Sequence, residues 1–283
     1  MNQIENAQNN NYSVLIAVYA NDDANLFSNA LSSLVSQSVL PADVVLVQDG
    51  PITVELDSVL IEYEAKLPLK IIRLTESGGL GNALKVGLRH CQNDLVGRAD
   101  SDDINLAHRF VTQVEFMNQN QEVDVLGSNL YESNEYTQRI KKVPNRVELG
   151  FKTFFRNPIN HQTVMFRKRA VLAVGGYEDC SNFEDYLLWC RLLRNGSKIA
   201  NLNSPLVIAN IDNLIEKRSG RDYATKERCF YAKLADLFPN YKLAIILAGS
   251  SRALLRYIPS SIIRQLYKLL RNSDDKDLQT LVK

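Results

Sequence analysis

The sequence lacks the features that mark several large classes of protein. Its 283 residues include only three histidines, and its four cysteines form no Cys-x-x-Cys pair, so no zinc site is expected. No stretch approaches the roughly 20 consecutive apolar residues of a membrane-spanning helix. Lys and Arg exceed Asp and Glu by only one, 33 against 32. This balance argues against a general nucleic-acid-binding surface and predicts no nucleic-acid partner.

The N-terminal segment also lacks an export signal. Residues 1–11 are rich in Asn and Gln, without a basic start or an apolar run, and we expect them to be disordered. We therefore expect a cytoplasmic protein with reduced thiols at Cys91, Cys180, Cys190 and Cys229. The hydrophobic fraction of 45% and the charged fraction of 23% are typical of a soluble globular chain.

The first half of the sequence alternates strand and helix patterns. Short apolar runs rich in β-branched residues predict strands, and apolar residues at helical spacing predict the helices between them. The predicted strands cover 12–18, 44–47, 69–74, 95–99 and 123–128, and the predicted helices cover 24–38, 54–66, 82–91 and 107–119. This alternation predicts an α/β fold with a Rossmann-like, mostly parallel sheet flanked by helices. Beyond about residue 130 the pattern is irregular, although a helix is expected from about 182 to Gly196.

Three unusual segments follow predicted strands. Asp49-Gly50 comes after the second strand, Gly78–Gly81 after the third, and Asp100–Asp103 after the fourth. Ligands on parallel sheets bind outside the carboxyl ends of the strands, so we expect these segments to form one site. Each alone has an ordinary alternative: an Asp-Gly turn, a tight turn, or an acidic turn that caps the next helix.

The acidic segment is a candidate metal site. Its three carboxylates lie within four residues and repel one another unless a cation neutralises them, and such hard oxygen ligands favour Mg²⁺ or Mn²⁺. Glu184-Asp185, at a predicted helix start, could supply a general base or simply cap the helix. The basic stretch Lys217–Arg221 could close over a diphosphate or be a solvated loop.

In order along the chain, these segments resemble the motifs of the family-2 glycosyltransferases, inverting enzymes of the GT-A fold. The resemblance covers roughly residues 12–225. It rests on Ala17–Asn21 (first-strand motif), Val45–Gly50 (Asp-Asp-Gly segment), Leu80–Leu88 (the glycine-loop and helix stretch), Arg98–Asp103 (DxD region) and Glu184-Asp185 (Glu-Asp motif). The chain departs from the family at Ala17, Gln48, Lys85 and Val86, where the usual residues are Pro, Asp, Arg and Asn.

The resemblance implies a role for each matching residue in transfer from a nucleotide-diphosphate sugar, commonly a UDP-sugar. It assigns Mn²⁺ or Mg²⁺ to Asp102 with Asp103 assisting, the general base to Asp185, and orientation of the acceptor or base to Glu184. The implied nucleotide-sugar contacts are Val18, Tyr19 and Asp49 at the base, Asp100 near the ribose or metal, Arg218 and Arg221 at the diphosphate, and also Gly79, Asn82, Lys85, Arg98 and Ser101. The implied acceptor contacts are His161 and Trp189.

The chain is expected to divide into a catalytic domain, residues 12–225, and a basic helical extension, residues 226–283. Within the catalytic domain, 12–128 would bind the nucleotide sugar and 129–225 the acceptor. Residues 241–271 carry six basic residues and no acid, with Pro259 dividing two helices. They predict peripheral attachment to an anionic membrane surface, the inner face of the cytoplasmic membrane. The alternative is a helix pair packed on the core.

The acceptor and two rival functions complete the expectations. The resemblance suggests a glycan acceptor carried on undecaprenyl diphosphate, in synthesis of surface polysaccharide such as O-antigen or capsule. A nucleotidyltransferase would need a basic glycine-rich loop after the first strand, which Tyr19–Asp22 does not provide. A non-catalytic nucleotide-sugar-binding or membrane scaffold would not need Asp102 and Asp185.

Overall fold

The computed structural model describes residues 11–134, 137–212 and 217–258. Their centre is a ten-stranded sheet in the order β3-β2-β1-β4-β9-β6-β10-β5, with β7 paired to β6 and β8 to β10. The strands are β1 (Ser13–Val18), β2 (Asp43–Gln48), β3 (Leu69–Arg73), β4 (Leu95–Ala99), β5 (Ile104–Asn105), β6 (Val123–Asn134), β7 (Thr137–Lys141), β8 (Arg146–Val147), β9 (Met165–Arg167) and β10 (Lys198–Asn210). The α-helices are α1 (Ala24–Val35), α2 (Val54–Glu64), α3 (Leu80–His90), α4 (Arg109–Gln119), α5 (Phe151–Phe155), α6 (Lys168–Ala173), α7 (Glu184–Arg194), α9 (Gly220–Leu237) and α10 (Lys242–Leu255).

The sheet is mostly parallel, as the sequence predicts. β1 pairs in parallel with β2 and β4, β2 with β3, and β6 with β10. The exception at the centre is β9, which runs antiparallel between β4 and β6. It is reversed because the chain enters it from the carboxyl edge of β4, where the amide of Arg98 donates to the carbonyl of Val164 at 2.9 Å. The sequence predicts neither the reversal nor the long strand β10.

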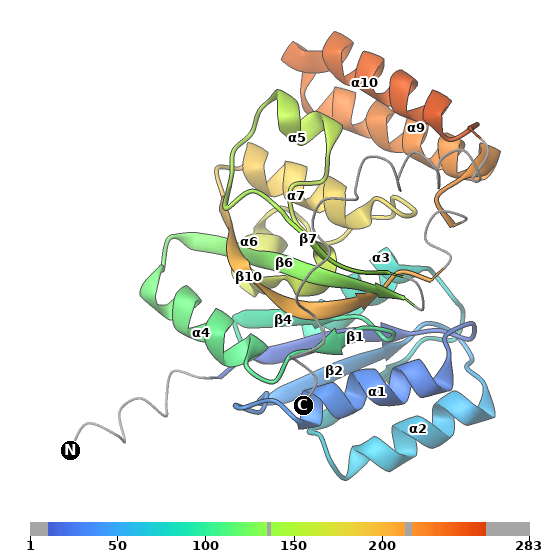
Figure 1. Ribbon diagram of the computed structural model, residues 1–283, viewed down its shortest axis with the longest axis vertical. Helices are drawn as coiled ribbons and strands as arrows, with labels where there is room; N and C mark the ends of the chain where they lie inside the picture. Colours follow the sequence, from blue (N-terminus) through green and yellow to red (C-terminus); the bar gives the residue numbers. More distant parts are fainter. Residues whose placement is uncertain (1–10, 135–136, 213–216, 259–283) are drawn as a thin grey trace.

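Two apolar layers cover the two faces of the sheet, with α1 and α2 below it in Figure 1. Strand residues alternate between the faces: Val14 and Ile16 of β1 pack with α1, α2 and α4, whereas Leu15 packs with α3 and α7. Both faces of β1 are therefore buried, as a parallel strand between helices requires.

A third apolar cluster joins α7 to the C-terminal helices α9 and α10, which lie at the far end of the molecule from α1 and α2 (Figure 1). Phe230 of α9 stacks on Phe183 with ring centroids 4.9 Å apart. Ile245 of α10 is completely buried in the same cluster. The residues 226–258 of the predicted extension thus pack on the catalytic fold, and residue 225 falls inside α9.

A buried ion-pair cluster fixes α10 to α9. Glu227 of α9 has no exposed surface and accepts hydrogen bonds from Nε of Arg252 and Nε of Arg256, both at 2.8 Å. Two of the six basic residues expected to face a membrane therefore face the protein instead, which corrects that part of the expectation. Pro259 and the rest of 259–283, like residues 1–10, lie outside the described residues.

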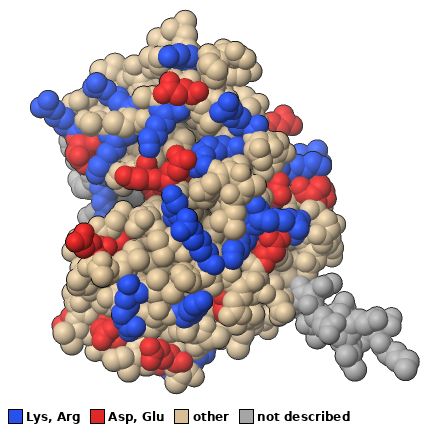
Figure 2. Space-filling view, turned by 180° about the vertical axis from the view of Figure 1, so that it is seen from behind, with Lys and Arg blue, Asp and Glu red and all other residues tan. Residues whose placement is uncertain are grey.

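Charge and hydropathy on the described surface agree with the composition. On the face seen from behind, basic and acidic side chains are interspersed (Figure 2). Among the described helices, none combines the length and the apolar character needed to cross a bilayer. The four cysteines are free, and only Cys229 is exposed.

A close approach of α3 to the sheet at Gly87 predicts a stability effect. A Cβ on Gly87 of α3 would lie 2.5 Å from Val47 and 2.6 Å from Leu15. Ala gains about 1 kcal/mol over Gly in a helix, but overpacking a core costs about 1–3 kcal/mol, so steric crowding should win. We expect Gly87→Ala to lower the free energy of unfolding in urea by about 1–2 kcal/mol. Gly150→Ala, where a Cβ meets open space, is the control; an equal or smaller loss in Gly87→Ala would contradict the packing argument.

Candidate active site

The sheet register brings the three unusual segments to one edge. Val18 at the end of β1 lies beside Gln48 at the end of β2, and Gln48 lies beside Arg73 at the end of β3. β4 pairs with the other side of β1 and ends at Ala99, next to the acidic segment. The prediction that these strand ends meet is confirmed.

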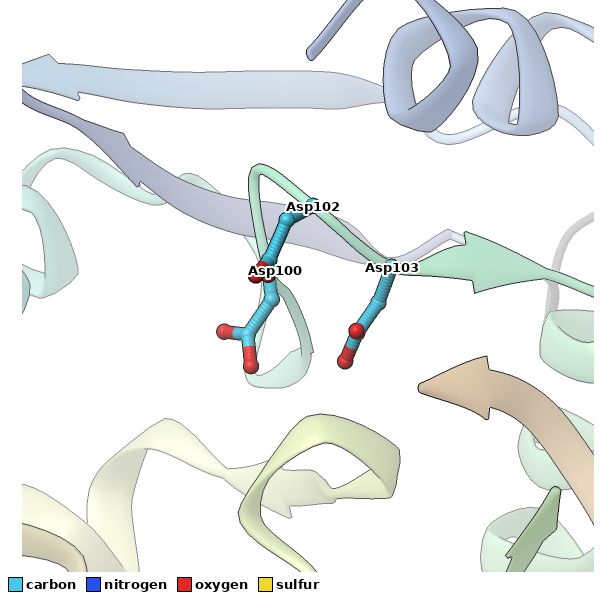
Figure 3. A group of neighbouring side chains, drawn as sticks. All are labelled: Asp100, Asp102 and Asp103. Atoms are coloured by element: carbon cyan, nitrogen blue, oxygen red, sulfur yellow. The ribbon is translucent and has the colours of Figure 1, made fainter. Parts of the chain in front are cut away.

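The acidic segment forms a turn between β4 and β5, and its carboxyl groups gather on one side of that turn (Figure 3). Asp100, Asp102 and Asp103 each offer an oxygen, and these three oxygens all lie within 4.8 Å of one another. Oδ1 of Asp103 accepts a hydrogen bond from the amide of Asn210 at 2.8 Å. Burial, together with the neighbouring Asp102 charge, raises the pKa of Asp103 to about 7.

Arg98, at the end of β4, is the cation beneath this turn. Its side chain is only 3% exposed, and its guanidinium forms an ion pair with Asp100. Its charge also acts on Asp102, Asp103 and Glu184. The sequence resemblance places Arg98 and Asp100 in contact with the donor, but in the structure they bind each other. We therefore assign Arg98 to positioning the acidic turn, because a buried guanidinium does not reach a nucleotide.

The donor set fits a hard divalent cation. Arg98 already neutralises Asp100, which leaves Asp102 and Asp103 as the carboxylates with excess charge. Oδ2 of Asp103 is buried and has no hydrogen-bond partner among the described residues. Asp102 lines a cavity of about 190 Å³ that also includes Asn210. Two carboxylates with free oxygens at an open site are the ligands that Mg²⁺ or Mn²⁺ takes beside phosphates.

Asp49 organises the glycine loop. Oδ1 accepts from the amide of Gly78 at 2.8 Å, and Oδ2 accepts from the amide of Gly79 at 3.0 Å and from the hydroxyl of Ser77 at 2.8 Å. Gly79 has a φ of +82°, a conformation that favours glycine. Three of the roughly four acceptor positions of the Asp49 carboxylate are thus taken by the loop, which leaves about one for the base contact that the resemblance implies. Beside it, Oε1 of Gln48 is buried without a hydrogen-bond partner among the described residues.

The other predicted donor residues line or support this edge. The side chain of Tyr19 is 44% exposed, whereas that of Val18 is 1% exposed and can offer only backbone. Ser101 hydrogen-bonds to Asp22, and burial raises the pKa of Asp22 to about 6. Asn82 and Lys85 lie in the first two turns of α3. The side-chain amide of Asn82 packs so closely on Gly78 that a Cβ at residue 78 would overlap it.

The Glu-Asp pair begins α7 after a special turn. Asn182 has a φ of 68°, the only positive value of a non-glycine residue in the described chain, and Asn tolerates this region better than most residues. Glu184 is 8% exposed, and burial together with the Asp185 charge raises its pKa to about 7. A Cβ on Gly81 would lie 3.2 Å from Cβ of Glu184. The starts of α3 and α7 are therefore in contact, so the glycine loop Gly78–Gly81 lies beside the Glu184-Asp185 pair.

Asp185 is held by a residue that the sequence prediction did not include. Nδ2 of Asn157 donates to Oδ2 of Asp185 at 2.7 Å. Burial raises the pKa of Asp185, and its hydrogen bonds and the charges of Arg218 and Arg98 oppose that rise. Asn157 lies in the loop before β9, and only its polar character within a short Asn-Pro turn could have suggested it. The arrangement gives a carboxylate that is fixed in direction and half-buried, as a general base requires.

His161 and Trp189 form a support beneath the acidic pair. Nε2 of His161 lies 3.0 Å from the hydroxyl of Tyr177, and its ring meets Trp189 edge-on at 6.0 Å. Burial lowers the pKa of His161 well below its usual value, so the ring is neutral. Trp189 is 0% exposed in the core, which corrects its expected contact with the acceptor: the indole packs inside α7 and supports the site from within.

The basic residues near residue 218 divide between two places. Lys217 acts electrostatically on Asp22 beside the acidic turn, whereas Arg218 acts on Asp185 and on Lys141 of β7. Arg221 is exposed in the first turn of α9. Lys141 and Asp22 were not predicted as site residues, and Lys217 was predicted only as part of the basic stretch Lys217–Arg221. Their signal is weak in the sequence, since a lone Lys or Asp in a loop is ordinary.

The comparison with sequence families decides the class of the chain. Residues 13–175, more than half of the sequence, match the family described as "Glycosyl transferase family 2". The chain belongs to glycosyl transferase family 2. It is 36% identical over 265 residues to the UDP-Gal:alpha-D-GlcNAc-diphosphoundecaprenol beta-1,3-galactosyltransferase of Escherichia coli, covering 91% of this chain and 95% of that protein. It is 33% identical over 270 residues to the amylovoran biosynthesis glycosyltransferase AmsE of Erwinia amylovora, covering 94% and 98%.

Solved structures share the fold at low sequence identity. S. aureus TarS residues 1–349 in complex with UDP-GlcNAc align with a TM-score of 0.64 and 20% identity, covering 93% of this chain and 76% of that one. The mannosyltransferase PcManGT of Pyrobaculum calidifontis, in complex with GDP-Man and Mn²⁺, aligns with a TM-score of 0.61 and 15% identity, covering 92% and 79%. The GT-A fold predicted from the sequence is confirmed.

The raised pKa of Glu184 predicts a pH-dependent cost to stability. Its carboxyl is protonated more readily in the folded chain than in the unfolded one, so its destabilising effect is absent below pH 4.5 and complete above pH 7. We expect Glu184→Gln to raise the free energy of unfolding by up to about 3 kcal/mol at pH 8 and to leave it unchanged near pH 4. Urea unfolding at the two pH values measures this difference. Equal effects of Glu184→Gln at both would contradict a buried, ionised Glu184.

Proposed function

We propose that the chain transfers a sugar, with inversion, from a nucleotide-diphosphate sugar to a hydroxyl of a glycan acceptor in surface polysaccharide biosynthesis. The observation that carries this proposal is that the buried Arg98 interacts electrostatically both with Asp102 and Asp103, whose oxygens lie together, and with Glu184 of the Glu-Asp pair. Such a site has a place for a charged leaving group and a base for an attacking hydroxyl. We further propose a UDP-sugar as donor, since the E. coli relative is named for UDP-Gal and a structural neighbour binds UDP-GlcNAc.

Asp102 and Asp103 would hold the divalent cation, Mg²⁺ or Mn²⁺. When bound, the cation neutralises the charge that develops on the departing nucleoside diphosphate. The chain's own contribution to donor binding would be the start of α3. The amides of Gly78 and Gly79 are bonded to Asp49 and fix the glycine loop, so phosphate oxygens would meet the first amides of the helix itself. Tyr19 and the end of β2 would flank the base. We assign residues 12–128 to the donor and 129–225 to the acceptor.

Asp185 would accept the proton of the acceptor hydroxyl as its oxygen attacks the anomeric carbon from the face opposite the leaving group. Asn157 keeps the Asp185 carboxylate in one orientation, and Glu184 orients the start of α7 against the donor loop. His161, neutral and bonded to Tyr177, would steady this wall of the acceptor site.

Asp185→Asn tests the base. The substitution keeps size and a polar partner for Asn157 but removes the proton acceptor, so the rate of transfer should fall by about 100-fold or more. The nucleotide dissociation constant should change by less than about threefold. Asp179→Asn, a nearby exposed aspartate, serves as the control. Retained transfer in Asp185→Asn, or lost nucleotide binding, would contradict the assignment.

Calorimetric titration of the full chain with UDP, GDP, dTDP and CDP, each with and without Mn²⁺, tests the donor. Metal-dependent binding of UDP alone supports a UDP-sugar. Binding of another nucleotide keeps the transferase and overturns the choice of base. Absence of binding by the folded protein would overturn the proposed function and favour a scaffold.

We also propose that the protein works in the cytoplasm at the inner face of the membrane, on an acceptor linked to undecaprenyl diphosphate. The E. coli relative is named for such an acceptor. The support in this chain is an exposed apolar face on α10: Leu243 is 73%, Leu247 61% and Leu254 69% exposed. These residues recur at helical spacing on one side of α10, which contains no acid. Within the described residues 241–258, the support for the predicted contact of 241–271 with an anionic membrane therefore comes from these exposed leucines.

Point substitutions test this contact better than truncation, because removing α10 would leave buried Glu227 without Arg252 and Arg256. We expect the triple change of Leu243, Leu247 and Leu254 to Gln to reduce the partition coefficient into phosphatidylglycerol vesicles, measured by sedimentation, by more than tenfold, because about 0.8 kcal/mol is lost per withdrawn CH₂. Val54→Gln with Ile61→Gln, equally exposed on α2, is the matched control. Unchanged sedimentation of the triple variant would rule out α10 as the membrane contact.

A further inference from the structure

Three basic side chains lie near Asp185. Lys141 at the end of β7, Arg156 at the end of α5 and Arg218 before α9 come from three separate segments. Lys141 is close enough to interact electrostatically with both arginines and with Asp185. Arg156 directly precedes Asn157, whose side chain is bonded to Asp185. The topology thus gathers like charges beside the base.

The carboxylates nearby do not balance this group. Glu132 of β6 faces Lys141, but Nε of Arg139 already donates to Glu132 at 2.6 Å. The four cations Lys141, Arg156, Arg218 and Arg139 thus stand against two carboxylates, Glu132 and Asp185. Arg98 and Glu184, which also interact with Asp185, balance each other, so the excess is about two positive charges. Arg156 and Arg218 are exposed and Lys141 is half-buried, so an incoming anion can reach all three. Like charges held together in this way repel one another, and a bound anion would remove the repulsion.

We propose that Lys141, Arg156 and Arg218 form a subsite for the diphosphate of a lipid-linked acceptor, separate from the donor diphosphate at Asp102 and Asp103. The inference rests on the proposed function and names the acceptor chemistry of that site. A diphosphate diester carries about two negative charges, which matches the excess, and Arg offers paired donors to phosphate oxygens.

The position of the group suits an acceptor rather than a donor. The acceptor hydroxyl must reach Asp185, so the anomeric phosphate of the acceptor sugar lies one sugar ring beyond it, away from the acidic turn. Lys217, the neighbour of Arg218, acts instead on Asp22 beside that turn. This reassigns Arg218 from the donor diphosphate, its role in the sequence resemblance, to the acceptor.

The group also adjoins the exposed face of α10. The guanidinium of Arg256, just after α10, donates to the carbonyl of Arg218 at 3.3 Å, and the amide of Gly220 donates to the carbonyl of Arg256 at 3.0 Å. A lipid chain attached to the diphosphate would therefore leave the subsite beside α10, which carries Leu254 exposed near this end. The proposed phosphate subsite therefore lies next to an apolar surface, as a diphosphate joined to a lipid chain requires.

The test compares three probes by calorimetry on the full chain: undecyl diphosphate, undecanol-linked GlcNAc without phosphate, and UDP with Mn²⁺. We expect Lys141→Met and Arg156→Met each to weaken undecyl diphosphate binding by about tenfold and to leave the UDP affinity unchanged. Lys152→Met, an exposed charge on α5, should alter neither. Using two single variants from different segments keeps the test valid if one fails to fold.

Three results would overturn the inference. Undecyl diphosphate could bind equally well to both variants and to the wild type, or fail to bind the wild type. Alternatively, both variants could lose UDP affinity, which would assign the group to the donor. In each case, transfer to the uncharged GlcNAc probe would show that the proposed function still stands. Absence of nucleotide binding and transfer in the wild type would instead mark failure of the proposed function itself.

Discussion

The site depends on one buried cation, the guanidinium of Arg98. Arg98 lies one residue before the end of the central strand β4, binds Asp100, and interacts electrostatically with Asp102, Asp103 and Glu184. Removing a charge from water costs several kcal/mol, and burial accordingly lowers the pKa of Arg98. The cost of burying Arg98 is offset because its charge attracts the surrounding carboxylates, which would otherwise repel one another at this poorly hydrated edge of the sheet. Arg98 thus holds the acidic turn, the proposed metal site, and the Glu-Asp pair, the proposed base, in one electrostatic unit.

A second buried arginine supports Arg98 through hydrogen bonds to the backbone. Arg109 of α4 has no exposed surface, and it donates to the carbonyl of Arg98 at 2.7 Å and to that of Val164 at 3.3 Å. It therefore fixes the joint between β4 and the reversed strand β9. At the start of α7, the stacking of Phe183 on Phe230 packs α7 against α9. The family-matched segment is residues 13–175, so helices outside it position Asp185, the proposed base.

The sequence predicts the strand ends that meet at the site because apolar runs and polar interruptions are local signals. It does not predict side-chain direction, which depends on contacts between distant segments. Asp49 matches a motif, yet its oxygens are engaged by Gly78 and Gly79; Trp189 follows the Glu-Asp pair, yet it points into the core. β10 was missed because its 13 residues alternate irregularly, with register shifts around Pro205. Such a strand is defined by its partner β6 rather than by its own pattern.

The C-terminal helices show how one segment can satisfy two physical demands. Glu227, Arg252 and Arg256 make the inner side of α10 a packing surface, since a buried carboxylate needs cationic partners to remain charged, and their hydrogen bonds and charges lower the pKa of Glu227 despite its burial. The outer side needs nothing from the fold, yet it exposes Leu243, Leu247 and Leu254. Exposed leucines on one side of a helix lower solubility and contribute nothing to the internal core. Their exposure on the helix that adjoins Arg218 therefore fits the membrane contact proposed for that side of the molecule.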